Sequence, residues 1–300
     1  MNIPEAFART IRDVYGDRGK TWLQNLPDLI RQCELRWSIT VLLPYQLSYN
    51  YVAPAIHSDG TPLVFKAGVP NPELSSEIDS LRLFDGQGIC RLLASDAALG
   101  ILLLEQVRPG LMLSTLKDDE AATSAAAAVM RQLWRPVPSV YNFPTVQRWA
   151  EGLQKLRRYF HGGSGPFPNK LVEEAEDLFE SLLVSMETPV LLHGDLHHYN
   201  ILSSTRQSWL AIDPKGVVGE PAYEVGALLR NPFWLLESAD LAAITARRID
   251  QLSAELHLDR VRIRDWALAQ AVLSAWWALE DHGHGWEGAI AFAQAISQIK

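Results

Sequence analysis

The chain has 300 residues, of which 21% are charged and 48% hydrophobic, and its formal net charge is -8 at pH 7. This length supplies enough apolar material for one large domain or for two lobes. An acidic chain without a cluster of Lys and Arg does not fit a nucleic-acid partner, because phosphate backbones are bound through basic residues. No run of 18 apolar residues occurs, so we expect no membrane span.

The expected compartment is the cytoplasm. The N-terminal stretch MNIPEAFARTIRDVYGDRGK is charged throughout, unlike a secretory signal. Cys33 and Cys90 have no CxxC or zinc-type spacing, which favours ordinary reduced thiols over a disulfide. We expect a monomer or weak dimer.

The first third of the chain predicts one helical segment and then a small β-rich part. Residues 5–35 have a helical pattern, with Pro27 at a break or at the first turn of a new helix. Short apolar runs follow, separated by turn signals such as Asp59-Gly60, and they indicate strands. The stretch PELSSEIDSLRLFDG has apolar residues at helical spacing. We therefore predict five mostly antiparallel strands and one inserted helix.

The rest of the chain is predicted to be mainly helical. AATSAAAAVMRQLW is a strong helix former, and RPVPSVYNFP is a proline-rich connector. Further helices are expected near 145–160, 169–187, 239–256, 262–281 and 286–298, with a strand–loop–strand block at 189–213. This pattern predicts an α+β protein in two parts, 1–106 and 107–300, joined by a hinge near 105–110.

The stretch VLLHGDLHHYNIL carries the densest group of polar side chains. His193, His197 and His198, together with Asp195, are residue types that bind metals, as in a metal-dependent hydrolase. However, neighbouring histidines in a loop usually point apart. The hydrolase is therefore the weaker alternative.

The spacing of the same stretch also fits phosphoryl transfer. His193, Asp195 and Asn200 follow the pattern H-x-D-x4-N, and the apolar strand WLAID then ends in Asp213. In this chemistry one carboxylate accepts the proton of the attacking hydroxyl. An amide oxygen and a second carboxylate hold Mg²⁺ against the phosphates. The H-x-D-x4-N pattern alone occurs by chance, but its combination with Asp213 at the expected distance favours a phosphoryl-transfer site.

The upstream sequence supplies what a kinase of this kind needs. Lys66 ends the strand PLVFK, and Glu77 follows eleven residues later on the predicted helix. In such kinases a Lys binds the phosphates of ATP and a Glu holds this Lys in place. The alternative is that Lys66 is an ordinary solvated residue at the end of a strand. Glu73 is a competing partner, although it lies nearer the helix start, where a carboxylate complements the dipole. The run ILLLEQV ends where Glu105 and Val107 are expected to present backbone groups to adenine.

Together these motifs resemble the aminoglycoside and hydroxyurea phosphotransferases, the streptomycin 6-phosphotransferase-like branch of the antibiotic-resistance kinases. The resemblance runs from about Trp37 to near the C-terminus and is carried by VFKAG, SSEIDSLRLFDGQG, LLLEQ, LLHGDLHHYNIL, IDPKGVVGEPAYEVGALLRNP and WWALEDHG. It implies a protein-kinase-like bilobal fold, with a small β-rich, nucleotide-binding N-lobe and a larger helical C-lobe that carries the catalytic loop and the acceptor site.

The resemblance also implies an activity, ATP- and Mg²⁺-dependent phosphorylation of a hydroxyl of a small molecule. Asp195 is then the catalytic base, Asn200 and Asp213 are the magnesium ligands, and Lys66 with Glu77 positions the phosphates. A catalytically inactive binding module is disfavoured, because each expected side chain is present.

Two segments depart from the expected pattern. LSYNYVAPA, where a loop should cover the phosphates, has no glycine, so Ser48 or Asn50 is the candidate there. In GEPAYEVG, Glu224 stands where the family pattern leads us to expect Asp, and we expect it to serve as a structural cap.

The acceptor is expected to contact Glu280 and Asp281, which follow Trp276-Trp277 near the end of an apolar helix. An aromatic and acidic cluster suits a guanidinium- or amine-bearing sugar. Packing of both Trp residues in the core is an equal alternative. A streptomycin-like aminoglycoside, hydroxyurea and another metabolic alcohol all remain open as acceptors.

Overall fold

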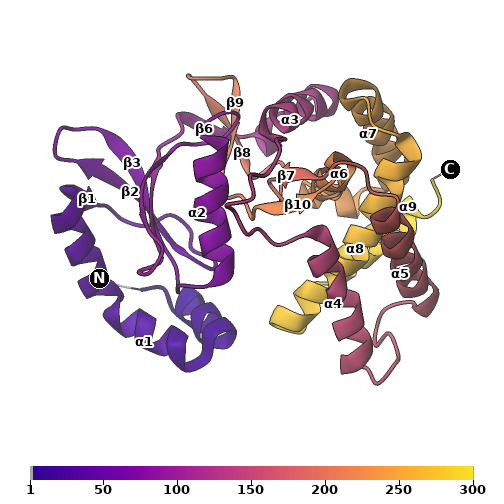
Figure 1. Cartoon of the computed structure of the whole chain (residues 1–300), viewed down its shortest axis with the longest axis horizontal. Helices are drawn as coiled ribbons and strands as arrows, with labels where there is room; N and C mark the ends of the chain where they lie inside the picture. The colour runs from indigo at the N-terminus through magenta and orange to yellow at the C-terminus, as the bar shows by residue number, and fades with distance from the viewer. Residues whose placement is uncertain (1–2, 300) are drawn as a thin grey trace. The chain divides into compact units, whose positions relative to one another are not determined.

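The computed structural model describes residues 3–299 of the chain. It divides into two compact units, Met1–Gly110 and Leu111–Lys300, which are described separately below. Figure 1 shows the first unit in indigo to magenta and the second in magenta to yellow. The sequence placed the division after residue 106.

Unit 1 is built on one five-stranded sheet with the strand order β1-β2-β3-β5-β4. Each strand pairs with its neighbours in antiparallel fashion, which confirms the predicted antiparallel part. The elements of this unit are α1 (Glu5–Trp37), β1 (Ile39–Val41), β2 (Tyr51–His57), β3 (Pro62–Ala67), α2 (Pro72–Phe84), β4 (Leu92–Asp96) and β5 (Ile101–Glu105).

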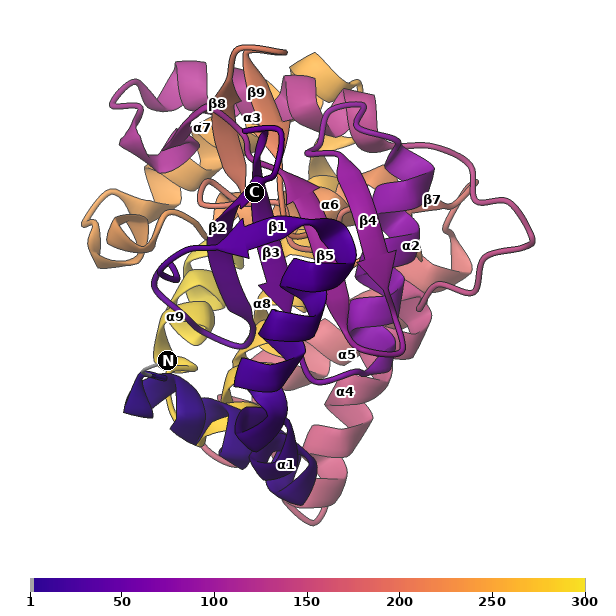
Figure 2. The same cartoon turned by 90° about the vertical axis from the view of Figure 1, so that its left-hand side faces the viewer.

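The two helices of unit 1 lie on opposite faces of this sheet (Figure 1). Phe65 of β3 faces α1, where it joins a core with Leu26 and Ile30 of that helix. Because successive side chains of a strand alternate between faces, Lys66 points to the other side. That face carries α2. Figure 2 shows α1 running across the first face.

The long helix α1 is interrupted at Gly16 rather than at Pro27. Gly16 has φ +57° and ψ -130°, which is not a helical conformation, while Pro27 lies inside the second helical stretch. Glycine adopts positive φ without the steric cost of a Cβ atom, so the chain turns there. The prediction of a break or a new helix start at Pro27 was therefore wrong.

Unit 2 is mainly helical, as predicted, and contains two small sheets with the orders β10-β7 and β6-β8-β9. Helix α8 packs against α4, α5, α6, α7 and α9. The remaining elements are β6 (Pro109–Met112, which begins before the division), η1 (Leu113–Thr115), α3 (Asp119–Leu133), α4 (Val146–Tyr159), α5 (Asn169–Val184), β7 (Val190–Leu192), β8 (Ile201–Ser204), β9 (Trp209–Ala211), β10 (Val217–Gly219), α6 (Pro221–Leu229), η2 (Phe233–Glu237), α7 (Leu241–Leu256), α8 (Arg260–His282) and α9 (Glu287–Ile296).

Helix α6 was not predicted from the sequence. Pro221 occupies its first turn, and eight of its residues, Ala222 to Leu229, are buried. A short helix that is buried on all sides has no exposed polar face and therefore no clear helical periodicity.

The short strands of unit 2 position the predicted catalytic residues. The loop from β7 to β8 carries Asp195 and Asn200, and the loop from β9 to β10 carries Asp213. Because β7 and β10 are paired, with Leu192 opposite Val217, the first loop starts where the second one ends.

Two further findings concern the described part of the chain as a whole. None of its helices combines the length and the apolar character that crossing a membrane requires. Cys33 and Cys90 are both buried thiols and are not bridged.

Candidate functional site

The predicted phosphate-positioning pair is formed in unit 1. The Nζ of Lys66 lies 2.7 Å from each carboxylate oxygen of Glu77, and only 4% and 5% of these two residues are exposed. Lys66 comes from β3 and Glu77 from α2. Glu73 lies in the first turn of α2 and is exposed, so Glu77 rather than Glu73 is the partner. A desolvated ion pair fixes the ammonium group in one place.

The predicted phosphate loop is the connection between β1 and β2. Ser48 is exposed within it. The Oδ1 of Asn50 lies close to Gly68: a Cβ atom placed on Gly68 would be only 2.2 Å from it. The backbone of Tyr45 donates to Val52, which continues the strand pairing into the loop. The role of Ser48 in nucleotide binding stays a prediction.

The predicted adenine-binding segment follows β5. The N–H of Glu105 donates to the carbonyl of Arg91 at 2.9 Å, and its carboxylate accepts from the N–H of Arg91 at 3.0 Å. Val107 is buried, and its backbone groups have no hydrogen-bond partner among residues 3–299. Unpaired backbone groups beside a buried side chain fit the predicted contact with a base, and the assignment of both residues stays a prediction.

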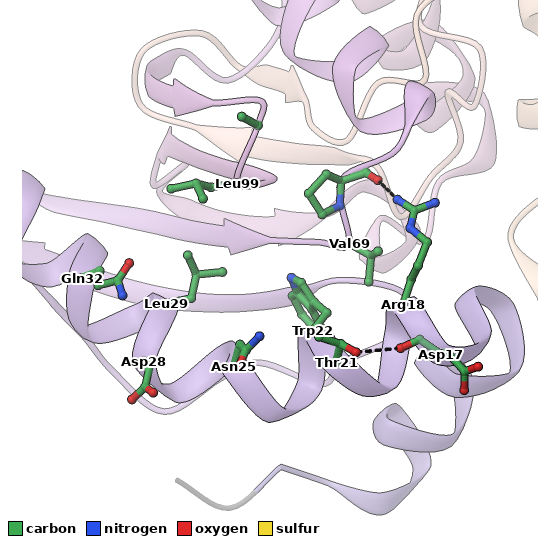
Figure 3. A pocket seen from close by; sticks show the side chains of 12 residues that line it. Asp17, Arg18, Thr21, Trp22, Asn25, Asp28, Leu29, Gln32, Val69 and Leu99 are labelled. Carbon is green, nitrogen blue, oxygen red and sulfur yellow. Dashed lines mark hydrogen bonds between the residues drawn. The ribbon is translucent and has the colours of Figure 1, made fainter.

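A groove of about 720 Å³ lies elsewhere in unit 1. It is on the α1 side of the sheet, where Arg18 donates to the carbonyl of Pro70 at 2.6 Å (Figure 3). The groove is lined by Trp22 and Val69 among others, and by none of the predicted nucleotide-site residues. It is therefore separate from the Lys66–Glu77 pair.

In unit 2, His193 connects the two loops that carry the predicted catalytic residues. Its Nε2 lies 2.8 Å from the carbonyl of Ile212, and its Nδ1 accepts from the N–H of Asp195 at 3.2 Å. This pair of contacts assigns the ring proton to Nε2. Burial lowers the pKa of His193 to about 4, so the ring is neutral near pH 7. His193 is therefore a positioning residue.

Asn200 brings the predicted metal ligands next to the predicted base. Its Nδ2 donates to the carbonyl of Asp195 at 3.0 Å, which leaves Oδ1 available as an acceptor. The carbonyl of Asn200 accepts from the N–H of Ile212 at 2.9 Å, directly before Asp213. Asp195, Asn200 and Asp213 are thus brought together by the fold.

Asp213 has an unusual backbone conformation. Its φ is +61°, in the left-handed region that most non-glycine residues avoid, and its side chain is exposed. Such a conformation costs free energy and tends to occur at functional sites. One amide oxygen and an exposed carboxylate are hard oxygen ligands of the kind that Mg²⁺ prefers, so these residues fit the ion.

The alternative metal site does not form. Among residues 3–299, no three His, Cys, Asp or Glu side chains converge as metal ligands. Both ring nitrogens of His193 are already engaged. His198 is 2% exposed, with a pKa that burial and the charge of Arg248 lower to about 3. The His193, His197 and His198 cluster therefore lacks the geometry that the hydrolase alternative requires.

Glu224 caps the catalytic loop from α6. Its Oε2 accepts from the N–H of His193 at 2.6 Å, and its Oε1 accepts from the N–H of Gly194 at 2.9 Å. Burial raises the pKa of Glu224 to about 7, although these N–H donors oppose the rise. A Glu in place of the expected Asp thus still reaches the loop.

The far end of α6 is held by a buried arginine. Arg248 of α7 is fully buried and donates to the carbonyl of Asn231 at 2.6 Å. It also donates to both carboxylate oxygens of Asp119, at 2.5 Å and 3.0 Å. Arg248 therefore ties α3 and α7 to the segment that follows α6.

Arg230, at the C-terminal end of α6, was not predicted as a site residue. Its Nη1 donates to the Oε1 of Gln270 at 2.7 Å. No carboxylate lies within ion-pair distance of it in the described chain, but it interacts electrostatically with Asp195. The motif LLRNP contained this residue, yet nothing in its spacing indicated a position near the base.

The predicted acceptor residues lie near the C-terminal end of α8. Trp276 is 2% exposed and packs against Tyr159, so it belongs to the core. Trp277 is only partly buried. Glu280 and Asp281 are exposed, and the Oε1 of Glu280 lies 4.0 Å from the Nζ of Lys155. Contact with an acceptor stays a prediction for both acidic residues.

The family model of the aminoglycoside/hydroxyurea antibiotic resistance kinases matches residues 41–282. The chain is 29% identical over 301 residues to the streptomycin 6-kinase of Streptomyces glaucescens, covering 99% of this chain and 97% of that protein. It is 33% identical over 279 residues to the hydroxyurea phosphotransferase of Kitasatospora aureofaciens, covering 89% and 77% of the two chains.

Solved structures show the same fold. The choline kinase of Streptococcus pneumoniae matches with a TM-score of 0.66 and 16% identity, covering 91% of this chain and 98% of that one. An aminoglycoside phosphotransferase in complex with ADP and hygromycin B matches with a TM-score of 0.62 and 15% identity, covering 90% and 96%. The predicted protein-kinase-like fold is therefore confirmed.

Proposed function

Because the chain belongs to the aminoglycoside/hydroxyurea antibiotic resistance kinase family, we propose that it transfers the γ-phosphoryl group of ATP, with Mg²⁺, to a hydroxyl of a cationic small molecule. The observation that carries this proposal is the convergence of Asp195, Asn200 and the left-handed Asp213 in unit 2. Relatives named as streptomycin 6-kinase and hydroxyurea phosphotransferase support the choice of a small-molecule acceptor. ATP is supplied inside the cell, so we place the reaction in the cytoplasm.

Each residue then has a definite task. The carboxylate of Asp195, whose side chain is 34% exposed, accepts the proton of the attacking hydroxyl. Lys66 binds phosphate oxygens and is held by Glu77. Asn200 Oδ1 and the Asp213 carboxylate would hold Mg²⁺, which supplies charge neutralisation at the phosphates when bound.

The acceptor is proposed to be cationic because of the charge of the chain. The net charge is -8, and two exposed carboxylates, Glu280 and Asp281, end α8. An acidic surface attracts cations and repels anionic substrates.

The activity can be tested with an assay that couples ADP release to NADH oxidation. The panel of acceptors is streptomycin, hydroxyurea, choline and neutral sugars, each with and without EDTA. We expect turnover with a cationic acceptor that disappears in EDTA. Turnover only on proteins or anionic compounds would contradict the proposed acceptor class, and no turnover with any acceptor would contradict the kinase activity.

The base can be tested by Asp195→Asn. We expect turnover to fall by about 10²- to 10⁴-fold, because a general base contributes that much. Binding of ATP, measured by calorimetry, should persist, since the substitution keeps the shape of the side chain. Asp177→Asn on the exposed side of α5 is the matched control. Turnover of Asp195→Asn close to that of the wild type would show that another group accepts the proton.

A further inference from the structure

Trp149 of α4 touches the catalytic loop. A Cβ atom placed on Gly194 would lie 2.9 Å from Cη2 of Trp149, so only a glycine lets the indole approach this closely. Gly194 also has φ +87°, which disfavours other residues. Asp195 is the next residue, and its carboxylate must come within about 3 Å of the acceptor hydroxyl. The indole of Trp149 is therefore a neighbour of any acceptor bound there.

Trp277 of α8 extends the aromatic surface that Trp149 begins. The two rings meet edge to face, with centroids 5.5 Å apart and an interplanar angle of 86°. Both residues are partly exposed, in contrast to the preceding Trp276, which is 2% exposed. Consecutive helix positions point about 100° apart, so Trp276 packs in the core while Trp277 points in another direction.

Acidic side chains continue the same helix face. Glu280 and Asp281 lie three and four residues after Trp277, which places them beside it on the surface of α8. Glu280 is 38% exposed in its side chain and lies 4.0 Å from the Nζ of Lys155. Such a weak, exposed ion pair leaves the carboxylate able to bind another cation.

We propose that Trp149 and Trp277, here called the tryptophan wall, bind a guanidinium or ammonium group of the acceptor by cation–π contact, with Glu280 at the outer end. This inference rests on the proposed kinase function. The cationic group of the acceptor then lies along the wall, between Asp195 and Glu280.

The extent of the wall also selects the size of the acceptor. The ring centroids are 5.5 Å apart, and three further helical residues add about 4.5 Å to reach Glu280. An acceptor that reaches from Asp195 to Glu280 has more than one ring. Hydroxyurea at Asp195 is too small to reach past Trp149 and Trp277 to Glu280, whereas a multi-ring sugar with guanidinium groups extends that far.

The test compares Trp277→Leu and Trp277→Phe with the wild type, using streptomycin and hydroxyurea as acceptors. We expect Trp277→Leu to raise the KM for streptomycin by about 3- to 30-fold, the range of a cation–π contact. Trp277→Phe keeps an aromatic face and should raise it less. The KM for ATP should not change in either variant. Trp286→Leu is the matched control, since Trp286 is also partly exposed and contacts Phe167.

The outcomes distinguish failure of the proposed tryptophan wall from failure of the proposed kinase activity. Streptomycin phosphorylation with an unchanged KM in both Trp277 variants would overturn the wall and leave the kinase function intact. Phosphorylation of hydroxyurea alone would also overturn the wall. Absence of any phosphoryl transfer by the wild type would overturn the proposed function itself. Trp149→Leu should act in the same direction as Trp277→Leu, and thermal melting curves identify a variant that has lost its fold.

Discussion

The two halves of the predicted site are held in place by different means. In unit 1, Lys66 and Glu77 hold each other through their charged side chains, at 2.7 Å and almost without exposure. In unit 2, Asp195 is positioned through its backbone: its N–H donates to His193, and its carbonyl accepts from Asn200. The carboxylate of Asp195 takes no part in these two hydrogen bonds, and its Oδ2 lies 3.7 Å from the Nε2 of His197.

In unit 2 the side chain proposed for catalysis does not hold the structure together, whereas in unit 1 the same two side chains are proposed for function and also form a buried ion pair. Changing the Asp195 side chain removes the proposed base but none of the backbone hydrogen bonds that shape the loop. Changing Lys66 removes the predicted ligand for phosphate and also removes the charge that lies against the buried carboxylate of Glu77. The two halves should therefore respond differently to the same kind of substitution.

The largest expected effect is that of Lys66→Met. The substitution removes the ammonium group from the buried carboxylate of Glu77, and breaking a buried ion pair in this way costs about 3–5 kcal/mol. The midpoint of urea unfolding should fall accordingly. In the double variant Lys66→Met/Glu77→Leu most of this loss should be recovered, because both charges are gone, while ATP binding stays lost. A double variant as unstable as the single one would show that the pair stabilises unit 1 by more than its own charges.

The next effect concerns His193→Asn and acid pH. The pKa of His193 is lowered by burial from 6.5 to about 4, so the unfolded chain binds its proton first as the pH falls. The stability from this group is complete above pH 6.5 and is lost as the pH falls towards 4, by about 3 kcal/mol over that window. His193→Asn removes the titration, so the unfolding free energy of the variant should fall less steeply with acid.

A matched control for this effect is His161→Asn. His161 is exposed and has φ +51°, a conformation that Asn tolerates. The control should keep the acid dependence of the wild type. An acid dependence in His193→Asn as steep as that of the wild type would show that other groups cause it.

The sequence predicted which side chains form the candidate site and their order along the chain. Lys66 and Glu77 were found by their position on a strand and the following helix, and the structure pairs them. The spacing of Asp195, Asn200 and Asp213 predicted a base and two magnesium ligands, and the structure places the three residues close together. The proximity of these residues could be anticipated because the chemistry depends on side chains at fixed spacings along the chain, while their roles in phosphoryl transfer stay predictions.

Contacts between distant segments could not be predicted in this way. Trp149 and Arg230 approach the loop at Asp195 from α4 and from the end of α6, and their roles depend on tertiary packing. The break at Gly16 was missed because Pro27 is the stronger break signal in sequence, while only the backbone conformation of Gly16 reveals the turn. Helix α6 was missed because it is buried on all sides, so its sequence has no alternation of polar and apolar faces.

The smallest expected effect concerns Glu224→Gln and has the opposite pH dependence to that of His193. Burial raises the pKa of Glu224 from 4.5 to about 7, so the unfolded chain loses this proton first as the pH rises. The stability from this group is complete below pH 4.5 and is lost as the pH rises to 7. Gln does not titrate. The advantage of the wild type over Glu224→Gln, measured by urea unfolding, should therefore shrink by about 2 kcal/mol between pH 5 and pH 8. Glu174→Gln on the exposed side of α5 is the control and should show no such change. If the advantage instead grows with pH, the N–H groups of His193 and Gly194 outweigh burial and keep Glu224 ionised, so backbone groups stabilise a buried carboxylate in unit 2 as the Lys66 side chain does in unit 1.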